Sequence, residues 1–328
     1  MGMKRPPLPS RAPTIFFGGF GEPLAHPDIV QMVADAKALG GPVELITNGT
    51  LLDDETARGL VDAGLDRLWV SLDGARPESY TDVRLGAALP EVLANVLRFR
   101  RLRPPAHREQ PELGIAFVAM KRNIADLPEL LQLAGKLAAS RFLVTNLLPH
   151  TLEMRDEILY THALKDITYL DSPQVPQASL PRIDIDGTTA AGLYEALRSH
   201  RNVSLAGNNL GSAVGRCPFI DAGAAAVGWD GRLSPCLPLL HNHAGFLGRR
   251  QRQVRRYAVG LVGENPLVDL WENAEHQAFR ERVRRFTFSP CAYCGGCERS
   301  LANLEDCFGN TFPTCGGCLW AQGVIQCP

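Results

Sequence analysis

Short apolar runs alternate with longer amphipathic stretches from Thr14 to about Pro149. Short runs bounded by Gly, Asn or Asp are typical of buried strands, and the stretches between them have the apolar spacing of helices. The predicted strands are Thr14–Phe17, Val43–Thr47, Arg67–Leu72, Leu113–Ala119 and Phe142–Leu147, and the predicted helices are Pro27–Leu39, Asp53–Ala63, Pro90–Arg101 and Ile124–Ala138. Strands and helices in this order predict an α/β fold with a parallel sheet.

The pattern changes in the second half of the chain. Prolines and a turn at Asp184–Gly187 interrupt residues 150–216, which we interpret as a linker on the substrate side. From Cys217 onward Gly, Pro and Cys become frequent, and only Asp269–Phe286 has clear helical spacing. We therefore expect three regions: an α/β domain at 1–149, the linker at 150–216 and a cysteine-rich domain at 217–328.

The overall charge excludes some classes of partner. The net charge is −1, with 45% hydrophobic and 21% charged residues, so the chain has no electrostatic footprint for nucleic acid or an anionic membrane. The basic stretch Arg249–Arg256 is interpreted as a solvated face. No apolar run reaches the roughly 18 residues of a membrane span, and Met1–Pro13 has no apolar core of a secretory signal. A cytoplasmic protein is expected.

The cysteines are the strongest chemical signal. All nine lie in the last 112 residues. Cytosolic thiols stay reduced, so such clustering indicates metal ligation rather than disulfides. Thiolates at Cys-x-x-Cys spacing bind iron–sulfur clusters or structural zinc, and the spacing leaves both possibilities open. Nine thiols allow two four-ligand sites with one left over, and the partition is also open. The candidate ligands are Cys217, Cys236, Cys291, Cys294, Cys297, Cys307, Cys315, Cys318 and Cys327.

Small polar residues follow three successive predicted strands. They form the segments Gly21-Glu22-Pro23, Thr47-Asn48-Gly49 and Ser71-Leu72-Asp73. The C-terminal ends of parallel strands meet at one edge of the sheet, where α/β barrels bind their ligands. The alternative is a set of independent tight turns, with Glu22 capping a helix. Taken together, the three segments favour a site for a polar small molecule.

The α/β pattern with these three polar segments along one edge resembles the radical S-adenosylmethionine (radical SAM) superfamily. The resemblance implies a partial (β/α)6 barrel that lacks its first strand. It also implies that Gly21, Glu22 and Pro23 lie against the methionyl amino group of S-adenosylmethionine. Ser71 and Asp73 would lie near the ribose with Thr47 and Asn48 beside them, and the rim at Thr145-Asn146 would approach the adenine.

The cysteine-rich region resembles the SPASM extension of that superfamily. Cys217, Gly231 and Cys236 have the spacing of its opening element, whereas the later cysteines depart from its usual middle spacing. The resemblance implies one or two auxiliary four-iron four-sulfur (4Fe-4S) clusters. The closing run 306–323 also resembles the radical SAM maturases associated with tungsten-cofactor oxidoreductases.

One departure from the superfamily pattern affects the expected activity. Radical SAM enzymes hold a catalytic 4Fe-4S cluster on a Cys-x-x-x-Cys-x-x-Cys loop before the Gly-Glu-Pro segment, and this sequence has no cysteine before Cys217. We expect an N-terminally truncated chain, with the catalytic cluster present only if the missing segment is present. The printed chain is expected not to generate the radical by itself.

The resemblance implies a maturase that modifies a peptide, a protein or the cofactor of a tungsten-dependent oxidoreductase. In the intact enzyme, an electron from a reductant such as ferredoxin or flavodoxin would cleave S-adenosylmethionine, and the resulting 5′-deoxyadenosyl radical would abstract hydrogen from the substrate. Two alternatives remain open: a non-catalytic iron–sulfur electron-transfer protein and a zinc-stabilised interaction module.

Overall fold

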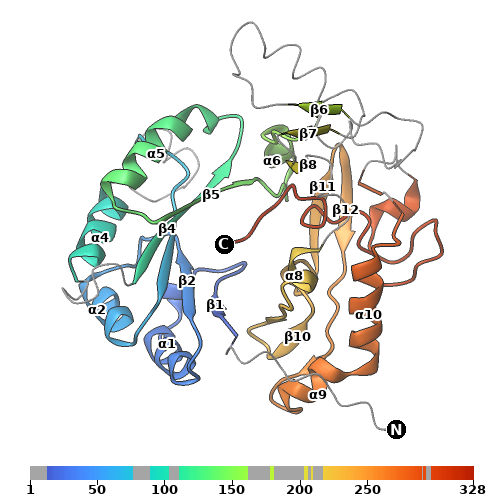
Figure 1. The fold of residues 1–328 in the computed structure, drawn as a ribbon, viewed down its shortest axis with the longest axis horizontal. Helices are drawn as coiled ribbons and strands as arrows, with labels where there is room; N and C mark the ends of the chain where they lie inside the picture. Colours follow the sequence, from blue (N-terminus) through green and yellow to red (C-terminus); the bar gives the residue numbers. More distant parts are fainter. Residues whose placement is uncertain are drawn as a thin grey trace, which may run out of the picture. The chain divides into compact units, whose positions relative to one another are not determined.

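The computed structural model describes residues 13–76, 89–102, 111–161, 217–289, 291–292 and 297–328, and the backbone of the short strands 178–180, 203–205 and 208–209. The chain divides into two compact units (Figure 1). Unit 1 consists of Met1–Thr145 with Cys327–Pro328, and unit 2 consists of Asn146–Gln326. Each unit is described by itself below.

Unit 1 contains a five-stranded sheet whose strands follow one another in chain order. The strands are β1 (Ile15–Phe17), β2 (Val43–Thr47), β3 (Arg67–Ser71), β4 (Glu112–Ala119) and β5 (Arg141–Asn146). The pairs β1·β2, β2·β3 and β3·β4 are parallel, and within the described residues β1 is an edge strand that pairs with β2. The predicted α/β class, with a parallel sheet of barrel type, is confirmed.

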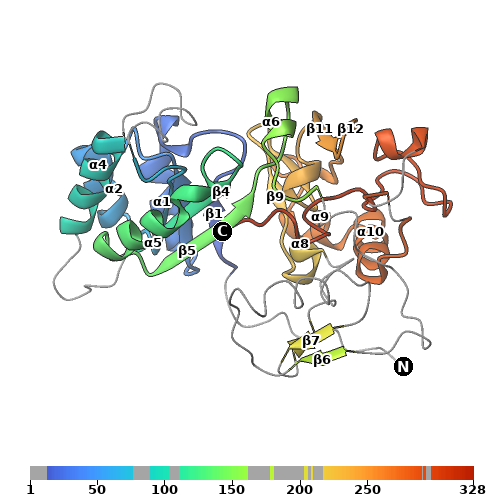
Figure 2. The same cartoon turned by 90° about the horizontal axis from the view of Figure 1, so that it is seen from above.

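The described helices of unit 1 lie on one face of this sheet, as the two views show (Figures 1 and 2). They are α1 (Ile29–Ala38), α2 (Asp54–Asp62), α4 (Leu89–Arg101) and α5 (Leu127–Lys136), with the short 3-10 turns η1 (Pro23–Ala25) and η3 (Ile124–Asp126). Alternate strand residues such as Leu45, Val70 and Phe117 point into the core beneath the helices and are fully buried. This period-two burial is what the apolar strand patterns predict.

The opposite face of the sheet carries polar and aromatic side chains. Arg67 forms an ion pair with Glu44 at 2.5 Å, and its Nε donates to Glu112 Oε2 at 2.9 Å. The Trp69 indole N–H donates to the second oxygen of Glu44 at 2.9 Å. A Cβ at Gly114 would overlap the Trp69 ring, so this glycine lets the indole lie flat on β4. Arg67 and Glu112 are the first residues of β3 and β4, so their ion pair lies at the N-terminal ends of these strands.

Unit 2 is built from short elements connected by long loops. The helical segments are α6 (Leu152–Asp156), α8 (Pro218–Asp221), η4 (Leu237–Leu239), α9 (Leu267–Glu272), α10 (Ala274–Arg285) and η5 (Glu298–Leu301). The strands are β6 (Ala178–Leu180), β7 (Val203–Leu205), β8 (Asn208–Asn209), β9 (Ala226–Val227), β10 (Arg232–Ser234), β11 (His243–Leu247), β12 (Arg250–Val254) and β13 (Gly260–Leu261). They form the sheets β13-β10-β9, β11-β12 and β6-β7-β8.

The single helix predicted for Asp269–Phe286 is wrong, because Asn273 divides the segment into α9 and α10. Asn273 has an extended backbone (φ −55°, ψ 133°), and its side chain accepts from the backbone N–H groups of Glu275 and His276. Asparagine is among the best N-cap residues, so it starts a new helix here. The apolar spacing continues across the break and conceals it.

Two other expectations can be compared with the structure. The interpretation of Arg249–Arg256 as a solvated face is wrong for Arg252, which is buried in β12. Most of the predicted linker 150–216 lies outside the described residues. No helix in the described part of the chain is long and apolar enough to cross a membrane.

Candidate functional site

Glu22 connects the first two polar segments of the rim in unit 1. It follows β1 and caps η1 by accepting from Leu24 N at 3.1 Å. Its Oε1 also accepts from the Thr47 hydroxyl at 2.6 Å, and its Oε2 accepts from Asn48 N at 2.8 Å. Glu22 therefore caps η1 and also contacts the next segment of the rim. Three of the predicted site residues are in direct contact.

The glycine and proline beside Glu22 shape the entrance to this rim. Pro23 is the first residue of η1, and a Cβ at Gly21 would meet no atom within 4 Å. The backbone of Gly21 therefore faces open space. Gly18, three residues earlier, is tightly packed instead, since a Cβ there would overlap the Phe16 ring.

The third rim segment is tied to the end of β4. Ser71 is the last residue of β3, and Asp73 is 3% exposed, with its Oδ1 accepting from Val118 N at 2.9 Å. Asn123, which is fully buried, donates to the backbone oxygens of Asp73 and Val118 at 3.0 and 2.9 Å. Asn123 thus fixes the β3 end of the rim. The sequence motifs did not identify it, although it follows the fourth predicted strand in the way that a turn residue does.

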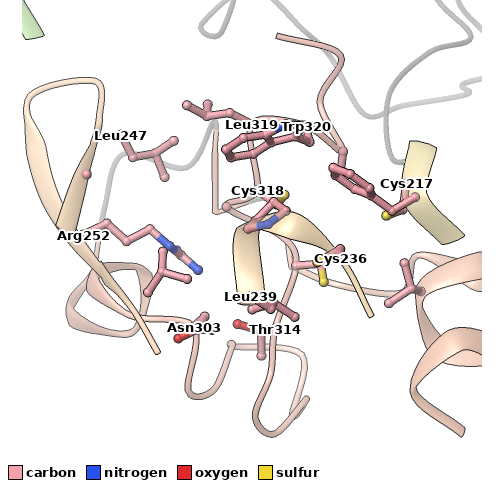
Figure 3. A pocket seen from close by; sticks show the side chains of 18 of the residues that line it. Cys217, Cys236, Leu239, Leu247, Arg252, Asn303, Thr314, Cys318, Leu319 and Trp320 are labelled. Carbon is pink, nitrogen blue, oxygen red and sulfur yellow. The ribbon is translucent and has the colours of Figure 1, made fainter. Parts of the chain in front are cut away.

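Four cysteines of unit 2 surround a cavity of about 70 Å³ (Figure 3). Cys217 precedes α8, Cys236 precedes η4, and Cys315 and Cys318 belong to the loop that follows η5. The other lining residues are mainly apolar, including Leu239, Phe246, Leu319 and Trp320. Segments far apart in the sequence therefore bring their thiols to one enclosed place.

The cavity disfavours free thiolates. Burial raises the pKa of Cys217 to about 11 and raises the pKa values of Cys236, Cys315 and Cys318 as well. Negative charge on the neighbouring thiolates, chiefly that of Cys318, adds to the rise for Cys217, Cys236 and Cys315. Four thiolates gathered in apolar surroundings are stable only when a cationic metal centre binds them. Four cysteines are the donor set that thiolate-bound iron–sulfur clusters use. Among the described residues, no three His, Cys, Asp or Glu side chains form a group that could hold a single metal ion.

A second group of cysteines is organised around Ser289. The Ser289 hydroxyl lies 3.3 Å from Cys291 Sγ, and Cys307 Sγ donates to the same hydroxyl at 3.1 Å. The buried Asp306 carboxylate accepts from Ser289 N at 3.0 Å and from the backbone N–H groups of Phe308 and Asn310. Sequence spacing did not single out Ser289 or Asp306, because the contact between them and the contact of Ser289 with Cys307 span 17 and 18 residues.

The remaining predicted ligands are not part of the cavity. Cys297 and Cys327 are exposed, and Cys327 belongs to unit 1. Cys294 lies outside the described residues.

Two glycines connect the two groups of cysteines. The backbone N–H of Ala292 donates to Gly316 O at 3.1 Å. A Cβ at Gly316 would overlap the carbonyl oxygen of Ser289, and a Cβ at Gly317 would overlap the guanidinium of Arg252. The Cys315–Cys318 turn therefore packs closely against the backbone of Ser289 and the side chain of Arg252.

Comparison with known proteins agrees with both units. The sequence model of the radical SAM superfamily matches residues 10–134, and that of the SPASM iron–sulfur cluster-binding domain matches residues 217–298. The tungsten-containing aldehyde ferredoxin oxidoreductase cofactor-modifying protein of Pyrococcus furiosus is 31% identical over 318 residues, which cover 96% of this chain and 83% of that protein. The AdoMet-dependent heme synthase of Methanosarcina barkeri is 26% identical, covering 80% of this chain and 69% of that protein.

Solved structures show the same fold. The native structure of anSMEcpe with bound AdoMet has a TM-score of 0.50 at 16% identity, covering 86% of this chain and 71% of that one. Streptococcus suis SuiB bound to S-adenosylmethionine gives a TM-score of 0.48 at 16% identity, and the present chain spans 59% of its length. The 31% identity with the relative from Pyrococcus furiosus and the two matching sequence models establish that the chain belongs to the radical SAM superfamily and carries a SPASM-type iron–sulfur cluster-binding domain.

Proposed function

We propose that this protein is a radical SAM maturase that modifies the cofactor of a tungsten-dependent oxidoreductase. The observation that carries the proposal is the 31% identity with the cofactor-modifying protein of Pyrococcus furiosus over 96% of the chain. The substrate is a cofactor or peptide of the oxidoreductase, and a reductant such as ferredoxin or flavodoxin supplies electrons. The concentration of reduced cysteines in one region supports a cytoplasmic location.

The proposed S-adenosylmethionine site is the rim made by Gly21, Glu22, Pro23, Thr47, Asn48, Ser71 and Asp73. When bound, S-adenosylmethionine supplies a 5′-deoxyadenosyl radical. The residues of the rim bind and orient this ligand. The contacts of Glu22 with Thr47 and Asn48 support the proposal, because they hold two segments of the rim in one place before a ligand arrives.

The proposed auxiliary cluster sites follow the two groups of cysteines. Cys217, Cys236, Cys315 and Cys318 hold one 4Fe-4S cluster in the cavity, which has room beyond a single ion. Cys291 and Cys307 hold a second cluster together with Cys294 and Cys297, and Cys327 is left over. The shared contact of Cys291 and Cys307 with Ser289 supports this division. The proposed domains remain 1–149 for the partial barrel, 150–216 for the substrate-side segment and 217–328 for the cluster domain.

Metal analysis of anaerobically purified protein tests the cluster sites. We expect about eight iron and eight sulfide per chain, since each thiolate-bound cubane holds four of each, and no stoichiometric zinc. Cys236→Ser should remove about half of the iron and sulfide, whereas the matched change Cys327→Ser should leave both unchanged. Stoichiometric zinc without sulfide would support the zinc-stabilised interaction module instead.

Product analysis tests the enzymatic activity. This chain and a chain extended at the N-terminus by a segment with the Cys-x-x-x-Cys-x-x-Cys motif are each mixed with dithionite, S-adenosylmethionine and the apo form of a tungsten oxidoreductase. We expect the extended chain to release 5′-deoxyadenosine and to modify the oxidoreductase cofactor, and the chain without that motif to release none. Fully loaded clusters with no product from either chain would favour the electron-transfer alternative.

A further inference from the structure

Arg252 places a buried positive charge at the wall of the thiol cavity. It lies in the middle of β12 and is only 6% exposed. Its Nη1 donates to Ser300 O at 2.7 Å, which fixes the position of the guanidinium. The close approach to Gly317 brings it against the turn that carries Cys315 and Cys318. In Figure 3 its side chain extends from β12 into the space that the cysteines surround.

Arg252 lies beside the cavity cysteines Cys315 and Cys318. Burial lowers the pKa of the guanidinium, and negative charge at nearby cysteines opposes that shift. The Ala292–Gly316 backbone bond holds the Cys315–Cys318 turn in place.

A buried arginine needs a negative partner to be stable, because an uncompensated charge in an apolar interior is costly. Arginine remains protonated in proteins, so the positive charge persists. Thiolates that hold a cluster are negative. The positive charge on Arg252 would thus complement the negative charge of thiolates that hold a cluster in the cavity.

We propose that Arg252 raises the reduction potential of the auxiliary cluster in the thiol cavity. This inference rests on the proposed cluster site. A cluster bound there that took up one electron from a reductant would become more negative by one charge, while no bond breaks and the guanidinium keeps its proton. The fixed positive charge would stabilise that reduced state more than the oxidised state.

Potentiometric titration followed by electron paramagnetic resonance tests the proposal on the anaerobically loaded protein. At a fixed applied potential, Arg252→Gln should lower the ratio of reduced to oxidised cluster about tenfold, which corresponds to a midpoint shift of about 59 mV for one electron. Arg252→Lys keeps the charge and should shift the ratio much less. The matched control Arg285→Gln removes the same charge from a side chain that is 70% exposed, and it should leave the ratio unchanged.

The iron and sulfide content separates the possible failures. Wild-type protein without sulfide would refute the cluster sites themselves. If wild type and Arg252→Gln bind equal amounts of iron and sulfide and have identical midpoint potentials, the role of Arg252 is refuted. The cluster sites themselves would not be affected by that result. If Arg252→Gln cannot be loaded, Gly317→Ala provides the test, since its added methyl group displaces the guanidinium without changing the net charge. A loaded Gly317→Ala protein with an unshifted midpoint would also overturn the proposal.

Discussion

Glu22 shows how one side chain orders several segments. Its carboxylate accepts from Leu24, Thr47 and Asn48, which belong to η1 and to the end of β2. A carboxylate accepts at both oxygens, whereas an amide must donate from one side. The geometry of the rim therefore depends on the charge of Glu22 as well as on its shape.

We predict that Glu22→Gln weakens both folding and ligand binding. The amide would direct N–H groups at a donor, so the free energy of unfolding should fall by about 1–3 kcal/mol. Urea unfolding and equilibrium binding of S-adenosylmethionine measure the two effects. The same change at Glu264, an exposed loop residue, serves as the control. Unchanged stability in Glu22→Gln would contradict the positioning role.

His276 predicts a pH dependence of stability. It is fully buried, its Nδ1 lies 3.3 Å from Leu270 O, and its Nε2 has no hydrogen-bond partner among the residues that the structure describes. Burial, and then the positive charge of Arg280, lower the pKa of His276. The unfolded chain therefore binds this proton more readily, and the stabilisation present above about pH 6.5 is lost as the pH falls toward the lowered pKa.

Urea unfolding of the loaded protein at pH 7.5 and pH 5.5 measures this effect, which amounts to about 1.4 kcal/mol for each unit of pKa shift. His276→Asn keeps a donor for Leu270 O and removes the titration, so it should lose less stability between the two pH values than wild type does. His26→Asn, at an exposed position, should behave like wild type. An equal loss in His276→Asn would rule out His276 as the source.

The sequence predicted that Glu22, Thr47 and Asn48 lie close together, because they stand at or after the ends of two predicted strands and parallel strands bring such positions to one edge. It did not identify Asn123, Ser289 or Arg252. Their roles come from contacts with segments distant in the sequence, such as that of Arg252 with Ser300, 48 residues away. No local pattern marks a buried cation within a basic stretch.

At the scale of elements, the strands of unit 1 follow their predicted bounds closely, and β2 matches its predicted range Val43–Thr47. The buried face of each strand determines its apolar period, so the signal is local. The division of α9 from α10 was missed because a cap such as Asn273 interrupts the backbone without interrupting the apolar period. For this part of the chain the sequence predicted only a cysteine-rich domain. Its strands are too short to show a detectable alternation of apolar and polar residues.

Gly114 provides a test of the polar face of the sheet. Gly114→Ala should displace the Trp69 ring and weaken its hydrogen bond to Glu44, destabilising the protein by about 1–3 kcal/mol. Thermal unfolding measures the change. Gly135→Ala, at an open position in α5, should instead be neutral or stabilise the protein by up to about 1 kcal/mol. Equal stability of the two variants would show that the indole relocates without cost.

At the scale of the whole molecule, each unit has a core of its own. The core of unit 1 lies between the sheet and its helices, whereas unit 2 has apolar clusters around Trp320 and around the cavity cysteines. The loss of a bound cluster should therefore affect one unit only. Sequence composition indicated only that the cysteines are separate from the α/β pattern, since all nine follow residue 216.

We predict that removal of iron by chelation under oxidation loosens unit 2 alone. Hydrogen exchange measured by mass spectrometry should rise in α8 and in residues 315–322, because the thiols there lose their common partner. Exchange in β2, β3 and β4 should stay unchanged and provides the internal control. A parallel rise in those strands would show that the two units unfold together.

The close packing at Gly316 limits which substitutions this turn can tolerate during evolution. Any side chain at Gly316 must push back the Ser289 carbonyl, and Ser289 in turn contacts Cys291 and Cys307. A library that randomises Gly316 should return almost only glycine under selection for bound iron. Rare survivors with alanine at Gly316 should carry a compensating change near Ser289, so substitutions in the two loops should be correlated.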